Sequence, residues 1–207
     1  MKHASIGLLA SVVSSIVVAQ AANFDGDAAG TPPAGWTCGS TGGGAPRWSV
    51  TVDPGAPSQP NVLMQTGRGP FPWCVKGGTA LSDGFVEVKF KPVSGRNDQA
   101  GGLVWRWKDG DHYYVARANA LENNVSLYHV EKGSRKTLKY TDAPVAAGSW
   151  HTLRVDFAGT RITVSLDGKR AIEFDDSHIA GPGAVGVWTK ADSVTAFDDF
   201  AYGAARP

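Results

Sequence analysis

Alternation of apolar and polar residues along the second half of the chain is the feature that most limits the folds open to it. In the run SWHTLRVDFAG, Leu153, Val155 and Phe157 fall on one side and polar residues on the other. Residues two apart share a face of a β-strand, whereas a helix repeats about every 3.6 residues. The pattern therefore predicts strands with one buried face.

A second run, TRITVSLDGKRAIEF, continues the alternation and is broken by Asp167-Gly168. Asp-Gly between two alternating runs is a strong short-range signal for a β-hairpin. The run GFVEVKFKPV alternates in the same way, and no segment carries a sustained helical stripe. We therefore expect an all-β antiparallel fold, either a sandwich or a barrel.

The first part of the expected mature chain has a different amino-acid composition. Residues 22–60 are rich in Gly, Pro and Thr, with isolated aromatic anchors at Phe24, Trp36 and Trp48. We interpret this stretch as loops and short strands that wrap the same body. One β-sandwich domain is expected over residues 22–207.

The N-terminal residues indicate export. Lys2 and His3 precede the apolar run IGLLASVVSSIVVA, and Ala19-Gln20-Ala21 follows as a small-residue cleavage pattern. These are the three parts of a secretory signal peptide, so residues 1–21 are expected to be removed and the protein to be periplasmic or secreted. Their removal takes away one lysine and no acid, so the formal net charge falls from +1 to zero. Nothing in this charge balance favours nucleic acid or an anionic membrane as a partner.

Cys38 and Cys74 are the two cysteines of the chain. In an oxidising compartment they most simply form one disulfide, and two free buried thiols are the alternative. A metal site built on them is not expected, because no C-x-x-C pair or clustered histidine accompanies them.

Two further strands carry the candidate chemistry. In LVWRW and the lysine that follows it, Leu103, Trp105 and Trp107 share one face, and the opposite face carries Val104, Arg106 and Lys108. In HYYVARAN, one face carries Tyr113, Val115, Arg117 and Asn119. An arginine in mid-strand is either solvated or paired, because an unpaired buried charge is too costly. Beside Trp and Tyr it also suits sugar binding, in which aromatic faces stack on sugar rings and polar groups bind hydroxyls.

Three long motifs resemble a known family: GRNDQAGGLVWRWKDGDHYYVARANALENNVSLYHV, WHTLRVDFAGTRITVSLDGK and GAVGVWTKADSVTAFDDF. They look like the exported bacterial domains called domain of unknown function 1080, or 3-keto-disaccharide hydrolase domains, of the concanavalin A-like lectin/glucanase superfamily. The resemblance covers about residues 24–202. It implies a jelly-roll sandwich of two curved antiparallel sheets whose concave face often holds carbohydrate.

Three functions are open on this basis. The leading hypothesis is a glycan-recognising domain; the others are an enzyme acting on an oxidised glycoside and a structural or adhesion module like laminin G domains. The residues expected to contact substrate are Arg106, Tyr113, Arg117, Asn119, Asn124, Trp188, Lys190 and Asp192. In the structural alternative, Arg117, Glu122 and Asp192 form an ion-pair and capping network that holds loops.

An enzyme on a 3-keto sugar would need a base beside the carbonyl and a group that stabilises the enolate oxygen. Glu122 or His129 is the candidate base, and Arg117, Arg106 or Lys190 the candidate oxyanion partner. The two-carboxylate mechanism of retaining glucanases is not supported. The nearest string is EFDDSH, residues 173–178, and it has His178 where the longer glucanase motif needs its second acid.

Metal binding is a further possibility. FDGD near the start of the expected mature chain and FDDF near its end supply Asp25 or Asp27 and Asp198 or Asp199. The superfamily resemblance implies that terminal strands lie together and share a structural calcium, with Asp25 and Asp199 as the first candidates. Solvated acidic turns are the alternative. The spacing of His112, His129 and His151 matches no metal motif.

Overall fold

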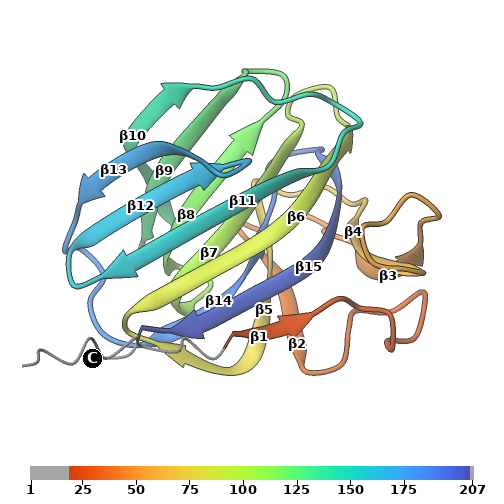
Figure 1. The fold of residues 1–207 in the computed structure, drawn as a ribbon, viewed down its shortest axis with the longest axis horizontal. Helices are drawn as coiled ribbons and strands as arrows, with labels where there is room; N and C mark the ends of the chain where they lie inside the picture. The colour runs from red at the N-terminus through yellow and green to blue at the C-terminus, as the bar shows by residue number, and fades with distance from the viewer. Residues whose placement is uncertain (1–18, 206–207) are drawn as a thin grey trace, which may run out of the picture.

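A computed structural model describes residues 19–205, which form strands and connecting loops without a helix (Figure 1). The strands are β1 (Gln20–Ala22), β2 (Trp36–Thr41), β3 (Trp48–Val52), β4 (Asn61–Gln65), β5 (Phe71–Leu81), β6 (Gly84–Ser94), β7 (Ala100–Asp109), β8 (His112–Asn119), β9 (Asn124–Glu131), β10 (Ser134–Asp142), β11 (His151–Ala158), β12 (Arg161–Leu166), β13 (Lys169–Asp175), β14 (Gly183–Trp188) and β15 (Val194–Ala204). The all-β prediction is confirmed.

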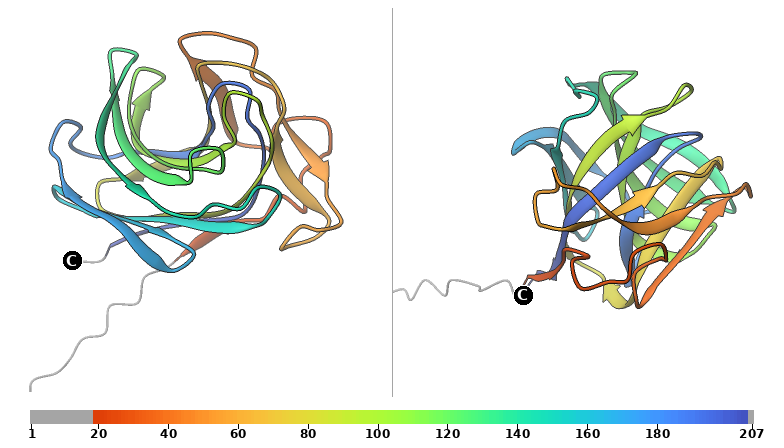
Figure 2. Two further views of the ribbon diagram at one scale, coloured as in Figure 1. Left: turned by 90° about the horizontal axis from the view of Figure 1, so that it is seen from above. Right: turned by 90° about the vertical axis from the view of Figure 1, so that its right-hand side faces the viewer.

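The strands form two antiparallel sheets. The outer sheet has the order β13-β12-β11-β6-β15-β4-β3, with β1 beside β15, and the concave sheet has the order β10-β9-β8-β7-β14-β5-β2. Each sheet pairs strands that are distant in sequence, such as β6 with β15 in the outer sheet and β7 with β14 in the concave sheet, as in a jelly roll. Seen from above in Figure 2, the backbone of the concave sheet bends into a U, and we call the inner side of this bend the hollow face.

The main hydrophobic core lies between the two sheets. The alternating residues of β11 and β12 point into it as predicted, and Phe90 joins them from β6. Trp105 stacks on Tyr114 at a centroid distance of 5.3 Å and lies 6.1 Å from Phe157 of the outer sheet. This aromatic contact joins the two sheets near the centre of the sandwich.

The hairpin predicted at Asp167-Gly168 joins β12 to β13, with Leu166 opposite Lys169. Asp167 and Gly168 both have positive φ, 50° and 74°, as a two-residue type I′ turn requires. The local sequence therefore accounts for the position and type of this turn.

The disulfide prediction is confirmed. Cys38 of β2 and Cys74 of β5 lie opposite each other in the concave sheet and are bonded. Cys74 is fully buried against the main core. The alternative of two free thiols is wrong.

The expected signal peptide falls mostly outside the described residues, since the description begins at residue 19. Gln20 and Ala21, which the expected cleavage would remove, pair with Tyr202 and Ala201 of β15. In residues 19–205 no helix has the length and apolar character needed to cross a membrane.

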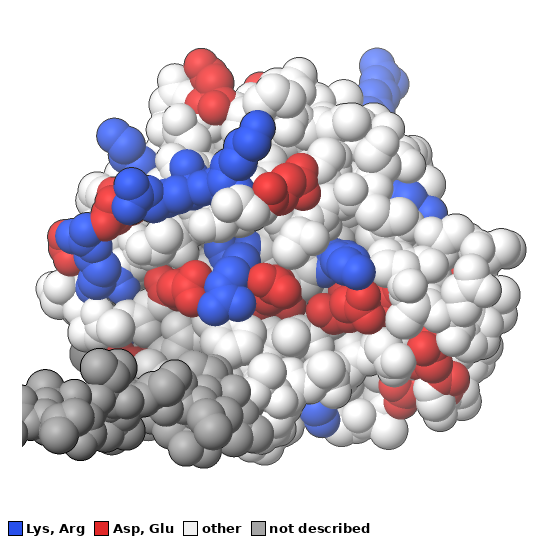
Figure 3. Space-filling model, viewed as in Figure 1, with Lys and Arg blue, Asp and Glu red and all other residues white. Residues whose placement is uncertain are grey.

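The solvent face of the outer sheet is covered by charged side chains of both signs (Figure 3). Lys89 pairs with Asp199 at 2.8 Å, and Arg154 lies 2.6 Å from Asp156 and 3.4 Å from Glu87. Exposed pairs of this kind contribute about 0–1 kcal/mol each, so their main effect is to keep this face solvated. The exposed side of the concave sheet, in contrast, carries an apolar cluster.

Candidate functional site

The hollow face of the concave sheet carries a second apolar cluster, separate from the main core. Tyr113 and Val115 of β8 belong to it together with Trp188 of β14 and Tyr128 of β9. Arg117 and Asn119 continue the alternation of β8 on the same face, as the sequence predicted. The polar end of this face is the candidate site.

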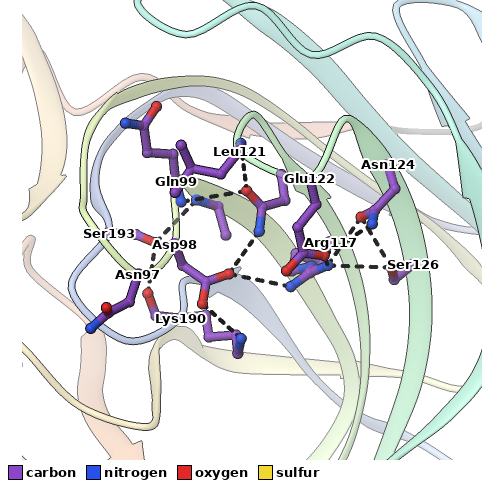
Figure 4. Close-up of polar contacts among 12 residues, drawn as sticks. Asn97, Asp98, Gln99, Arg117, Leu121, Glu122, Asn124, Ser126, Lys190 and Ser193 are labelled. Atoms are coloured by element: carbon purple, nitrogen blue, oxygen red, sulfur yellow. Dashed lines mark hydrogen bonds and ion pairs between the residues drawn. The ribbon is translucent and has the colours of Figure 1, made fainter.

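Arg117 is the centre of the polar network (Figure 4). Its side chain is 2% exposed, and the guanidinium donates to Glu122 Oε2 at 2.5 Å, to Asn124 Oδ1 at 3.0 Å and to Ser126 Oγ at 3.5 Å. A second ion pair joins Arg117 Nη1 to Asp98 at 3.4 Å. A buried guanidinium needs such partners, and here they come from two loops and a neighbouring strand.

Asp98 ties this arginine to the other side of the hollow. Its carboxylate accepts from Asn119 Nδ2 and from Lys190 Nζ, both at 2.7 Å. Asp192 accepts three backbone N–H groups, those of residues 96–98. The loop that holds Asp98 is thus fixed by the loop that carries Lys190, and Asp98 links Lys190 to Arg117.

A pocket of about 250 Å³ opens beside Arg117. Its lining residues are Arg117, Glu122, Asn124, Ser126, Tyr128, Thr137 and Tyr140. Tyr140 of the edge strand β10 is 61% exposed, so much of this aromatic side chain beside the pocket is open to solvent. Polar groups on the floor and an exposed aromatic ring at the rim are therefore combined in one place.

Glu122 is held as an ionised carboxylate. Partial burial opposes its ionisation, but hydrogen bonds from Asn124 and Arg117 and the positive charges of Arg117 and Lys190 outweigh it, so the pKa of Glu122 lies below its usual value. A carboxylate already accepting from a guanidinium is a weak base. This geometry favours a binding contact over proton abstraction.

The aromatic part of the face is covered by Arg135 of β10. Its guanidinium lies 4.2 Å from the ring centroid of Tyr128, 4.9 Å from Phe71 and 5.9 Å from Trp188. Trp188 is fully buried beneath it. Tyr113, also fully buried, is hydrogen bonded to Thr41 Oγ1 at 2.6 Å. Both predicted contact residues therefore support the floor of the hollow and do not line the open pocket.

The predicted position of Arg106 is wrong. Arg106 has a positive φ of 46° in an irregular part of β7, and this shifts the alternation so that Trp107, not Arg106, lies on the face of Val104. The Arg106 side chain instead donates to the carbonyl oxygens of Ser82, Gly159 and Ile179. It closes one end of the sandwich and lies apart from the Arg117 network.

His129 also lies apart from Glu122. On β9 it follows Val125 and Leu127 on the side that faces the main core, opposite to Tyr128. Burial, followed by the charge of the neighbouring His178, lowers the pKa of His129. The two candidate bases therefore cannot serve one site on the hollow face.

The EFDDSH string begins on β13, the edge strand of the outer sheet. Glu173 pairs with Arg161 and Arg170, and Asp175 pairs with Arg161. These acids occupy the solvated outer surface.

The acids proposed for calcium do not fit that ion. Asp25 accepts the backbone N–H of Asn61 at 3.0 Å, while Asp199 pairs with Lys89 on the outer face. Asp198 is buried and accepts both the N–H and the hydroxyl of Ser58. Calcium needs several oxygens directed at one point, whereas these carboxylates are directed at separate hydrogen-bond donors.

The sequence analysis missed four residues that line the pocket, Ser126, Tyr128, Thr137 and Tyr140, and it also missed Asp98, the buried ion-pair partner of Arg117. Period two starting from Asn124 would have placed Ser126 and Tyr128 on the face of Arg117. No local signal links Asp98 to Arg117, because their contact depends on the pairing of β7 with β8 and on the loop before β7.

No family model matches the chain, and no curated protein matches it either. Solved structures do match. The carbohydrate-binding module CBM66 from Bacillus subtilis gives a TM-score of 0.65 at 20% identity, over 84% of this chain and 97% of that chain. A Bacillus licheniformis β-glucanase gives 0.60 at 12% identity, over 94% and 100%. A lichenase from a mouse hindgut metagenome gives 0.58 at 13% identity, over 90% and 98%. At these identities the likeness establishes the concanavalin A-like jelly-roll fold of this chain.

Proposed function

We propose that this protein is a carbohydrate-recognising domain that binds a glycan in the Arg117 pocket of the concave sheet. The observation that carries the proposal is the combination of a fixed polar network with the exposed ring of Tyr140 at one pocket. The fold supports it, because one structural neighbour is named a carbohydrate-binding module and others are named glucanases. Fold alone would not suffice, since one architecture hosts many functions.

The chemistry of the pocket suits a neutral sugar. The Tyr140 ring supplies an apolar face for stacking, and Thr137, Asn124 and Glu122 supply a hydroxyl, an amide and a carboxylate for sugar hydroxyls. Glu122 has a 43% exposed side chain, so one side of it remains open to a ligand. Arg117 and Asp98 keep these groups in place before binding, which reduces the entropy lost on complex formation.

Binding is measured with a glycan array, followed by calorimetric titration of the best ligand. Tyr140→Ala and Asn124→Ala are expected to weaken binding by about 10-fold or more, as loss of about 1.4 kcal/mol would. Val52→Ala is the matched control, because Val52 is an exposed apolar residue of β3 on the other sheet, 60% exposed. If no glycan on the array binds the protein, or if Val52→Ala weakens glycan binding as much as Tyr140→Ala does, the proposal is rejected and the structural or adhesion module is favoured.

The enzymatic alternative is tested on the same protein. Incubation with 3-keto-disaccharides is expected to give no product. Product formed by the wild type and lost in Glu122→Gln would replace the binding proposal with a hydrolase or lyase acting on 3-keto glycosides.

We further propose that residues 22–207 form the functional domain, that it acts in the periplasm or outside the cell, and that it belongs with the domains of unknown function 1080. The Cys38–Cys74 disulfide supports an oxidising compartment. Mass spectrometry of the exported protein, showing whether the chain begins after Ala21, tests the first two statements.

A further inference from the structure

A group of three metal-binding side chains lies away from the Arg117 pocket. His129, Asp176 and His178 each offer a ligand atom, and these atoms lie within 4.8 Å of one another. Within residues 19–205 they are the one group of three or more His, Cys, Asp and Glu side chains gathered in this way. His129 comes from β9 of the concave sheet, whereas Asp176 and His178 follow β13 of the outer sheet.

His129 is the unusual member. It is 2% exposed, and neither ring nitrogen has a hydrogen-bond partner. A buried polar group without a partner costs about 1–3 kcal/mol. Its ring centroid lies 4.2 Å from that of His178, so the free nitrogens are next to the other two side chains.

Asp176 is fixed as a carboxylate facing this histidine pair. Its Oδ1 accepts from the Tyr114 hydroxyl and from the backbone N–H of His178, and its Oδ2 lies 2.8 Å from His178 Nδ1. Tyr114 in turn accepts the N–H of Ile179 at 3.1 Å. Hydrogen bonds of this kind behind a ligating carboxylate are typical of metal sites.

Two other histidine–carboxylate pairs provide a comparison. His112 pairs with Asp109 and His151 with Asp167, each across 2.8–2.9 Å. In both cases the ring nitrogens are satisfied, because His112 Nε2 accepts from Lys132 N–H and His151 Nε2 contacts the backbone of Ala146. These pairs brace turns, whereas the His178 pair faces a second, unpartnered imidazole.

We propose that His129, Asp176 and His178 bind a divalent transition-metal ion, with Zn²⁺ as the representative ion. Two imidazoles and a carboxylate suit zinc and not calcium or magnesium, which prefer oxygen ligands alone. Ligand atoms in tetrahedral zinc sites lie about 3.3 Å apart, so a modest rotation of the His178 ring, whose side chain is 53% exposed, closes the group around an ion. Because His178 lies at the surface, a fourth position remains open to water.

This site is independent of the glycan pocket, because His129 and Tyr128 point to opposite sides of β9. Zinc binding is measured by isothermal titration with ZnCl₂ on the full mature chain without a histidine tag, and by the visible absorption of bound Co²⁺. We expect one ion per chain. His178→Gln should weaken binding by more than about 100-fold, since even changes behind the ligands cost about 10–100-fold.

His151→Gln is the matched control and should bind as the wild type does, because it removes a histidine from an equivalent carboxylate pair. His129→Leu should also abolish binding, and its thermal unfolding shows whether the variant is folded. Tyr114→Phe, which removes only the supporting hydroxyl, should weaken binding by about 10-fold. The proposal is overturned if the wild type gives no saturable binding, or if His178→Gln and His151→Gln bind zinc alike.

Discussion

Replacing Asp98 by alanine is the most direct test of how the concave site is built. Asp98 and Arg117 have side chains that are each 2% exposed, and Asp98 is also the partner of Asn119 and Lys190. Asp98→Ala leaves the Arg117 Nη1 and the Asn119 amide without this acceptor in a region closed to water. Breaking a buried pair from one side costs about 3–5 kcal/mol.

The loss of stability in Asp98→Ala should be large enough to measure by thermal unfolding. For a domain of this size, 1 kcal/mol shifts the midpoint of thermal unfolding by about 2–4 °C, so Asp98→Ala should lower it by roughly 10 °C. Urea unfolding followed by tryptophan fluorescence gives the free energy directly. Asp156→Ala is the matched control, because Asp156 pairs with Arg154 at 2.6 Å on the solvated outer face, and it should cost less than about 1 kcal/mol.

A double-mutant cycle separates the ion pair from simple loss of volume. The Lys190 side chain is 25% exposed, so Lys190→Met by itself should lower the free energy of unfolding only slightly. In the Asp98→Ala background the same change should raise the free energy of unfolding by about 1 kcal/mol or more, because it removes an uncompensated charge. Equal destabilisation by Asp98→Ala and Asp156→Ala, with additive effects of Lys190→Met, would refute this account of the site.

Three further predictions concern stability. Burial raises the pKa of Tyr113 to about 12. The stability that the protonated phenol contributes is therefore complete below a pH of about 10 and is lost as pH rises through about 12. Urea unfolding across this window should show that the free energy of unfolding falls more steeply for the wild type than for Tyr113→Phe. Gly95→Ala should cost about 1–3 kcal/mol and weaken glycan binding, because φ is +154° and a Cβ would overlap the Asp98 carbonyl oxygen. Replacing Cys38 and Cys74 by serine should lower stability by about 4 kcal/mol, measured by urea unfolding, since the bridge joins residues 36 positions apart.

Each of these has a clear contrary result. Parallel pH profiles for wild type and Tyr113→Phe would show that the phenol is not protected in the folded state. Wild-type stability of Gly95→Ala would mean that the loop before Asp98 is free to move. Unchanged unfolding of the double serine variant would show that the disulfide does not restrict the unfolded chain.

The amino-acid sequence by itself determined the strands and their faces wherever the alternation is unbroken. The hairpin at Asp167-Gly168 and the shared face of Tyr113, Arg117 and Asn119 follow from period two and from turn chemistry, which are properties of a few adjacent residues. The Cys38–Cys74 bond could be expected because the chain holds just these two cysteines.

Tertiary structure alone decided the rest. The positive φ of Arg106 moves its side chain to the end of the sandwich, and nothing in the spacing of LVWRW signals that irregularity. Asp98 meets Arg117, and His129 meets Asp176 and His178, through pairings between segments distant in the chain. Such contacts are set by how the two sheets align and pack, because side-chain spacing fixes the face of a strand but not the strand or loop that lies opposite to it.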